Sequence, residues 1–74
     1  MDFDYAKLKG KIREKFTTQA YFANAIGLSP TSVSDKLNNK CSWTQSEIGR
    51  AADVLEIDKI DIPNYFFAEK VKVL

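Results

Sequence analysis

The sequence has 74 residues, a net charge of +1, one cysteine and no histidine. A chain of this length supports one domain with one modest core and leaves little room for a deep cleft, so we expect a single domain over residues 1–74 that is not an enzyme and takes no small-molecule substrate. Without histidine, and with Cys41 as the lone thiol, neither an internal disulfide nor a multi-cysteine zinc site can form, and we expect no metal and no cofactor.

The first predicted helix lies within residues 5–16. Its apolar side chains recur at steps of three and four residues and draw one stripe along a helix: Tyr5, Leu8, Ile12 and Phe16. A neighbouring basic stripe follows at four-residue spacing and consists of Lys7, Lys11 and Lys15. A solvated helix surface is the favoured interpretation of this basic stripe, and contact with phosphates is the alternative.

Two shorter helices follow, separated by a tight turn. Thr18 can cap the first of them, which is expected to end at Gly27 because glycine readily adopts the positive φ of a helix end. Ser29 can cap the second, and Pro30 suits its first position because the missing N–H is not needed there. This second helix is expected to end near residues 38–40, where asparagine tolerates a left-handed conformation.

A fourth helix is expected over residues 44–55. The sequence TQSE at 44–47 matches the capping box, in which Thr44 and Glu47 exchange hydrogen bonds between side chain and backbone. Pro63 then opens a short helix that reaches residue 67. The segment KVKVL at 70–74 alternates as a short C-terminal strand does, with a frayed end as the alternative.

Residues 18–38 carry the spacing of a helix-turn-helix unit. A small residue, Ala23, lies where two helices must approach closely, and Gly27 follows four residues later at the turn. Leu28 fills the space beside the turn, and Val33 packs the second helix back onto the first. In such a unit the turn sets the angle at which the second helix, the recognition helix, is presented to a partner.

A known family shares this pattern. The helix-turn-helix of the Cro/repressor (Xre-type) family of phage and bacterial regulators resembles this region over the pattern Gln19-xxx-Ala23-xxx-Gly27-Leu28-Ser29-xxx-Val33-Ser34. The resemblance covers about residues 5–67 and extends to small phage-encoded Cro-like proteins of Gram-positive hosts. It implies a compact all-α, lambda-repressor-like bundle of five helices that binds operator DNA as a dimer. One departure is Lys36, at a position that many family members fill with an apolar residue.

The outward face of the recognition helix supplies the expected base contacts, because this helix lies in the major groove in helix-turn-helix proteins. The resemblance implies that Ser29, Thr31 and Asp35 contact bases or backbone. A carboxylate suits a cytosine amino group, with an intrahelical cation as the alternative partner of Asp35, and Lys36 could reach guanine or remain solvated. The full set expected at the bases is Ser29, Thr31, Ser32, Asp35 and Lys36.

Backbone contacts are expected on either side of the recognition helix. The resemblance implies that Gln19 bonds a phosphate and braces that helix. Asn38 could instead act only as a helix stop, and Thr44 could be occupied by its capping role. The full set expected at the DNA backbone is Thr18, Gln19, Asn38, Lys40 and Thr44. The charge distribution permits such an approach, since residues 1–16 carry five basic and three acidic side chains, whereas residues 51–74 carry three basic and five acidic ones.

A homodimer is expected, because few cations are well placed and a dimer would read two half-sites. The candidate dimerisation tail is residues 60–74, which could also pair antiparallel with its symmetry mate. Its apolar side chains are Ile60, Ile62, Tyr65, Phe66 and Phe67, and completion of the core is the alternative for at least half of them.

The sequence therefore predicts a Cro-like repressor that occupies operator DNA. The alternatives are a DNA-binding antitoxin and a helical protein-interaction module that does not bind DNA. The chain has neither a signal segment nor an apolar run of membrane length, so we expect no membrane partner and a cytoplasmic location in a bacterial host cell.

Overall fold

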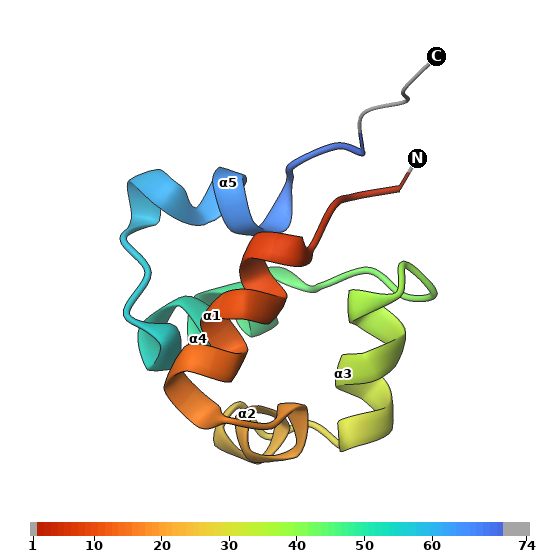
Figure 1. Ribbon diagram of the computed structural model, residues 1–74, viewed down its shortest axis with the longest axis vertical. Coiled ribbons are helices and arrows are strands. Elements are labelled where there is room, and N and C mark those ends of the chain that lie inside the picture. The colour runs from red at the N-terminus through yellow and green to blue at the C-terminus, as the bar shows by residue number, and fades with distance from the viewer. Residues whose placement is uncertain (1, 71–74) are drawn as a thin grey trace.

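The computed structural model describes residues 2–70, which form a bundle of five α-helices (Figure 1). The helices are α1 (Ala6–Phe16), α2 (Gln19–Ala25), α3 (Pro30–Leu37), α4 (Gln45–Leu55) and α5 (Ile62–Phe66), with a short 3₁₀ helix, η1 (Lys59–Asp61), before α5. This architecture confirms the prediction of a compact all-helical fold with five helices. None of the described helices combines the length and the apolar character needed to cross a bilayer.

The core lies between α1 and the other helices. α1 runs through the middle of the bundle and contacts α2, α4 and α5 (Figure 1). Its predicted apolar stripe is buried, since Leu8 and Ile12 are at most 1% exposed and Tyr5 is 6% exposed. Every α-helix contributes to the same core, which consists of Tyr5, Leu8, Ile12, Phe22, Ala23, Ile26, Val33, Leu37, Ala51, Ala52, Leu55, Ile57 and Phe66.

The connection from α1 to α2 is strained. Thr17 has φ 69° and ψ −47°, and the Thr18 N–H donates to the Phe16 carbonyl at 2.7 Å. These angles define a γ-turn of the rare positive-φ form, in which a β-branched residue is especially unfavourable. The turn reverses the chain within one residue and places Thr18 at the start of α2, where its hydroxyl accepts the Tyr21 N–H at 3.2 Å.

The turn from α2 to α3 is a Schellman motif. The Leu28 N–H donates to the Ala23 carbonyl at 2.9 Å, and the Gly27 N–H donates to the Asn24 carbonyl at 3.2 Å. Gly27 has φ 75°, in agreement with its predicted role. A Cβ atom at this position would lie 3.4 Å from the guanidinium of Arg50 in α4, so the turn also packs closely against the rest of the bundle.

The two ends of the described chain lie side by side (Figure 1). Phe3 and Glu69 form an isolated antiparallel bridge. The Asn39 side chain accepts the Phe3 N–H and donates to the Phe3 carbonyl, both at 3.0 Å. Residues 68–70 therefore pair with the chain's own N-terminal segment, and the predicted strand over residues 70–74 lies, beyond Lys70, outside the described residues.

Candidate nucleic-acid interface

The outer face of α3 is polar at its N-terminal end. Thr31 is exposed and Ser32 is partly exposed. The Ser29 hydroxyl caps the helix by accepting the Ser32 N–H at 3.1 Å, and it donates to the Ser32 hydroxyl at 3.0 Å. The Ser29 hydroxyl therefore uses both its donor and an acceptor function at the helix start, whereas the Ser32 O–H remains free to donate, and no side-chain hydrogen bond forms at Thr31 among residues 2–70.

Lys36 points into the fold instead of toward this outer face. Its ammonium group lies 3.0 Å from Glu47 Oε1, and both side chains are only 11% exposed. The same group donates to the Ser42 carbonyl at 2.9 Å and lies 6.0 Å from the centre of the Trp43 ring. Lys36 therefore fills the buried position that the family pattern reserves for an apolar residue, and its charge is compensated inside the protein. Its expected role at the bases is not supported by this placement.

Glu47 joins α3 to the start of α4. The predicted capping box is present, with the Thr44 N–H donating to Glu47 Oε1 at 2.9 Å and the Glu47 N–H donating to the Thr44 hydroxyl at 3.2 Å. Burial by itself raises the pKa of Glu47, but the Thr44 hydrogen bond and the Lys36 charge outweigh it and hold the pKa below its usual value. One carboxylate thus links α3 to the start of α4.

Asp35 keeps a free carboxylate at the edge of the outer face. It is partly exposed, and no salt bridge forms at Asp35 within residues 2–70. The nearest cation along the helix, Lys36, is paired with Glu47 instead. The alternative of an intrahelical ion pair for Asp35 is therefore not realised in the described residues, and its carboxylate remains available as an acceptor.

The expected backbone contacts lie at the ends of α2, α3 and α4. Gln19 is exposed at the first position of α2, next to the capping Thr18. Asn38 ends α3, and its amide donates to the Ser34 carbonyl at 2.9 Å, so this side chain has a role at the helix end. Lys40 is exposed in the loop after α3, and Thr44 is exposed at the start of α4. The hydroxyl groups of Thr18 and Thr44 accept backbone N–H groups, which leaves each O–H free to donate.

The basic stripe predicted on α1 is engaged within the protein. Lys7 lies over the Tyr65 ring, 4.7 Å from its centre. Lys11 pairs with Glu14 at 3.8 Å, and Lys15 with Glu56 at 2.9 Å. The hydrogen bond to Glu56 raises the pKa of Lys15, and the reverse effect lowers that of Glu56. These contacts argue against the phosphate interpretation of this stripe.

Two other cations of α1 were not singled out by the sequence pattern. Lys9 and Arg13, four residues apart, are exposed and form no salt bridge with any residue in the described range. Together with Thr17, Thr18 and Gln19 they line a shallow pocket of about 220 Å³. The γ-turn creates this proximity, because it brings the start of α2 back against α1.

The apolar side chains near the C-terminus mostly complete the core. Phe66 is 1% exposed, and Ile62 and Tyr65 are partly buried against the core. Ile60 and Phe67 are 84% and 50% exposed. The core interpretation therefore holds for three of the five side chains that were candidates for a dimer surface.

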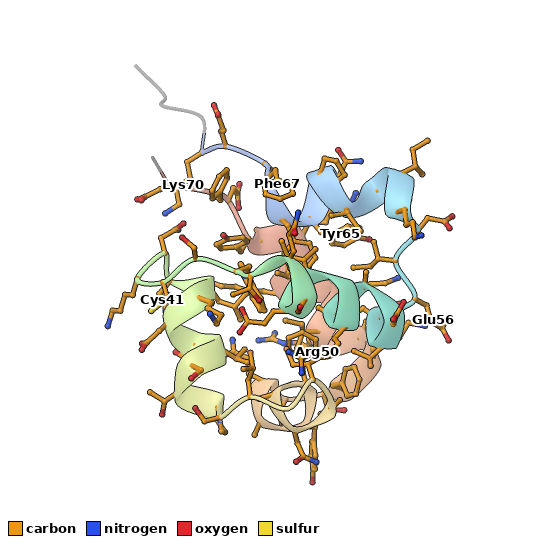
Figure 2. All side chains as sticks on the ribbon, turned by 180° about the vertical axis from the view of Figure 1, so that it is seen from behind. Cys41, Arg50, Glu56, Tyr65, Phe67 and Lys70 are labelled. Carbon is orange, nitrogen blue, oxygen red and sulfur yellow. The ribbon has the colours of Figure 1, made fainter. Side chains whose placement is uncertain are left out.

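A second pocket, of about 290 Å³, opens between the N-terminal segment, the loop from α3 to α4, and α5. Five of the lining side chains are aromatic, among them Phe3, Trp43 and Phe67, and Cys41 also lines the pocket. Figure 2 looks onto this side, with Phe67 above the loop that carries Cys41. The Trp43 indole N–H is buried and has no hydrogen-bond acceptor among residues 2–70. It nevertheless offsets part of the rise that burial causes in the pKa of the nearby Tyr5 hydroxyl.

The fold defines a small all-helical protein, and among residues 2–70 no cluster of three or more histidine, cysteine or acidic side chains could hold a metal ion. The chain belongs to the family described as "Protein of unknown function (DUF739)", whose model matches residues 1–69. It is similar to the modulator of repression (MOR) of the temperate bacteriophage TP901-1 from Lactococcus lactis, with 53% sequence identity and a TM-score of 0.80 over 97% of each chain. A comparison with curated proteins finds no match.

Proposed function

We propose that this protein is a phage transcriptional regulator that binds double-stranded DNA by placing α3 in the major groove. One observation carries the proposal: a Schellman turn ties α3 to α2, the Lys36–Glu47 pair ties it to α4, and its outer face is polar and exposed at Thr31. In a helix-turn-helix protein the second helix presents such a polar, exposed face to the major groove. The likeness to a small phage protein named for repression is consistent with a regulatory role.

The roles of the individual residues follow from their placement. Thr31 and Asp35 are the principal base contacts, since a hydroxyl with a methyl group and an acceptor-only carboxylate both suit base edges in the major groove. Ser32 contributes a free O–H donor, whereas the Ser29 O–H already donates to the Ser32 hydroxyl. Thr18, Gln19, Asn38, Lys40 and Thr44 contact the backbone and set the register of α3.

Two copies are proposed to bind adjacent half-sites about one helical turn apart, because one monomer offers few cations. Among residues 2–70 the large apolar side chains that are exposed are Tyr21, Ile60 and Phe67, which are too few for an extensive dimer interface in the absence of DNA. We therefore propose that the two copies associate as a homodimer when they bind DNA.

Selection of bound duplexes from a random DNA pool tests the proposal directly. We expect a two-fold symmetric consensus, and a gel-shift affinity for it that falls as salt rises from about 50 to 200 mM. Failure to enrich any sequence, or binding that does not weaken with salt, would refute DNA recognition.

A second candidate function is protein interaction: the chain would modulate repression by binding a repressor. Three observations favour it, namely the name of the similar phage protein, the net charge of only +1, and the aromatic-lined pocket beside Trp43. Co-purification with a repressor encoded in the same genome distinguishes the candidates. Partner binding that persists after Thr31→Ala but is lost after Phe67→Ser would favour this second function.

A further inference from the structure

The pocket at the junction of α1 and α2 concentrates hydrogen-bond donors and positive charge. It is lined by Lys9, Ile12, Arg13, Thr17, Thr18 and Gln19. Ile12 is 1% exposed and belongs to the core. The other five side chains are polar or cationic, and the lining contains no carboxylate. A site of this composition favours an anion, because nothing in its lining repels negative charge.

The two cations of this pocket differ from the remaining cations of α1. Lys7, Lys11 and Lys15 have a ring or carboxylate partner within the protein, whereas Lys9 and Arg13 have none among residues 2–70. Their spacing of four residues places them on one face of α1. The helix therefore has one face whose charges are used internally and another whose charges remain available.

Lys9 connects this pocket to the end of the recognition helix. It also lines a neighbouring pocket of about 210 Å³ together with Leu37, Asn38 and Asn39. Asp4 lines that neighbouring pocket as well, and its carboxylate accepts the Ala6 N–H at 2.9 Å. The face that carries Lys9 and Arg13 thus runs between the start of α2 and the end of α3, which are two of the places where DNA backbone contacts are proposed.

We propose that Lys9 and Arg13 form a phosphate cradle for one backbone phosphate of double-stranded DNA. The guanidinium of Arg13 can donate two parallel hydrogen bonds to phosphate oxygens, and Lys9 supplies a second positive charge. The Gln19 amide and the Thr18 hydroxyl add neutral donors from the facing side of the pocket. This inference rests on the proposed DNA binding, and it assigns to α1 an electrostatic role in addition to the role of α3 in reading bases.

The test measures how DNA affinity depends on salt for variants that each lose one charge. Lys9→Gln and Arg13→Gln are compared with Lys7→Gln and Lys15→Gln, which remove the same charge from the same helix but from its internally paired face. Glutamine is a good helix former, so α1 is expected to remain intact, and circular dichroism checks this. Fluorescence anisotropy gives the affinity for a selected duplex and for an unrelated duplex over about 50–200 mM salt.

The cradle predicts that Lys9→Gln and Arg13→Gln each lower the salt slope by about one, because each loses one phosphate contact, and weaken both duplexes by the same factor. The two control variants are expected to keep the slope of the unmodified protein. If the unmodified protein binds DNA but all four variants have equal slopes, the cradle is refuted and the proposed function stands. If the unmodified protein binds neither duplex, both proposals fail.

Discussion

Replacement of Lys36 by methionine tests the link between α3 and α4. Lys36 Nζ lies 3.0 Å from Glu47 Oε1, and each side chain is 11% exposed. Methionine retains most of the apolar volume but removes the charge and the hydrogen bond to the Ser42 carbonyl. Glu47 would then remain as a buried carboxylate whose side chain accepts only the Thr44 N–H.

The expected loss of stability follows from the burial of the pair. Removal of one partner from a fully buried ion pair costs about 3–5 kcal/mol. Because these two side chains retain some contact with water and Glu47 keeps its capping hydrogen bond, we expect about 2 kcal/mol. A domain of this size has a free energy of unfolding of about 4–11 kcal/mol. The melting temperature of Lys36→Met should therefore fall by roughly 10–15 °C.

The effect should depend on pH through Glu47. Burial raises the pKa of its carboxyl, but the Thr44 hydrogen bond and Lys36 together hold it below the usual value. A carboxyl with a lowered pKa in the folded state stabilises the fold above the pKa of the unfolded chain, and this contribution is lost as pH falls through the folded pKa. In Lys36→Met, burial raises the pKa of Glu47, so the penalty should be largest near neutral pH and shrink below about pH 4.

Urea unfolding followed by far-ultraviolet circular dichroism measures this effect at neutral pH and at about pH 3.5. Lys40→Met is the matched control, because Lys40 is exposed in the loop after the same helix. Its stability is expected to stay within about 0.5 kcal/mol of the unmodified protein. If Lys36→Met is as stable as this control at neutral pH, the pair does not hold α3 against α4 and the reasoning is wrong.

Three further substitutions test α2, α3 and the γ-turn that precedes α2. Thr31→Ala should abolish sequence preference in footprinting while leaving the melting temperature within a few degrees, and an unchanged footprint would show that α3 does not read bases as proposed. Ala23→Leu should destabilise the protein by at least about 1–3 kcal/mol, since Ala23 is fully buried where α2 meets α3; a stable variant in calorimetry would contradict the close packing described. Thr17→Gly should raise the urea concentration at the unfolding midpoint, because relief of about 1–2 kcal/mol of backbone strain exceeds the entropic cost of glycine. A lower midpoint would refute the strained γ-turn.

The helices were predictable because their signals are local. Thr18, Ser29 and Thr44 cap helices as the sequence predicts, and Gly27 ends α2 with positive φ. The spacing of apolar residues identified the buried face of α1 correctly. Capping and periodicity depend on neighbours within one or two turns, so a single sequence contains the information needed.

The surface cations were harder to assign. The regular spacing of Lys7, Lys11 and Lys15 drew attention to the stripe whose charges the folded protein uses internally. Lys9 and Arg13 show the same spacing of four residues, and nothing in the sequence distinguishes one stripe from the other. Lys7 and Lys15 find their partners, Tyr65 and Glu56, in distant segments of the chain, so only the folded structure separates paired charges from available ones.

The sequence by itself therefore determined the number of helices, their capped ends, the tight turn before α3 and the buried apolar stripe of α1. Each of these features depends on contacts within a short stretch of chain. Tertiary structure alone decided that Lys36 turns inward to Glu47, that Asn39 clamps the N-terminal segment, and that residues 68–70 pair within the chain. The physical reason is common to all three: a charged or polar group, in a side chain or in the backbone, takes the best partner that the fold brings near it, and that partner lies in another element or is distant in sequence.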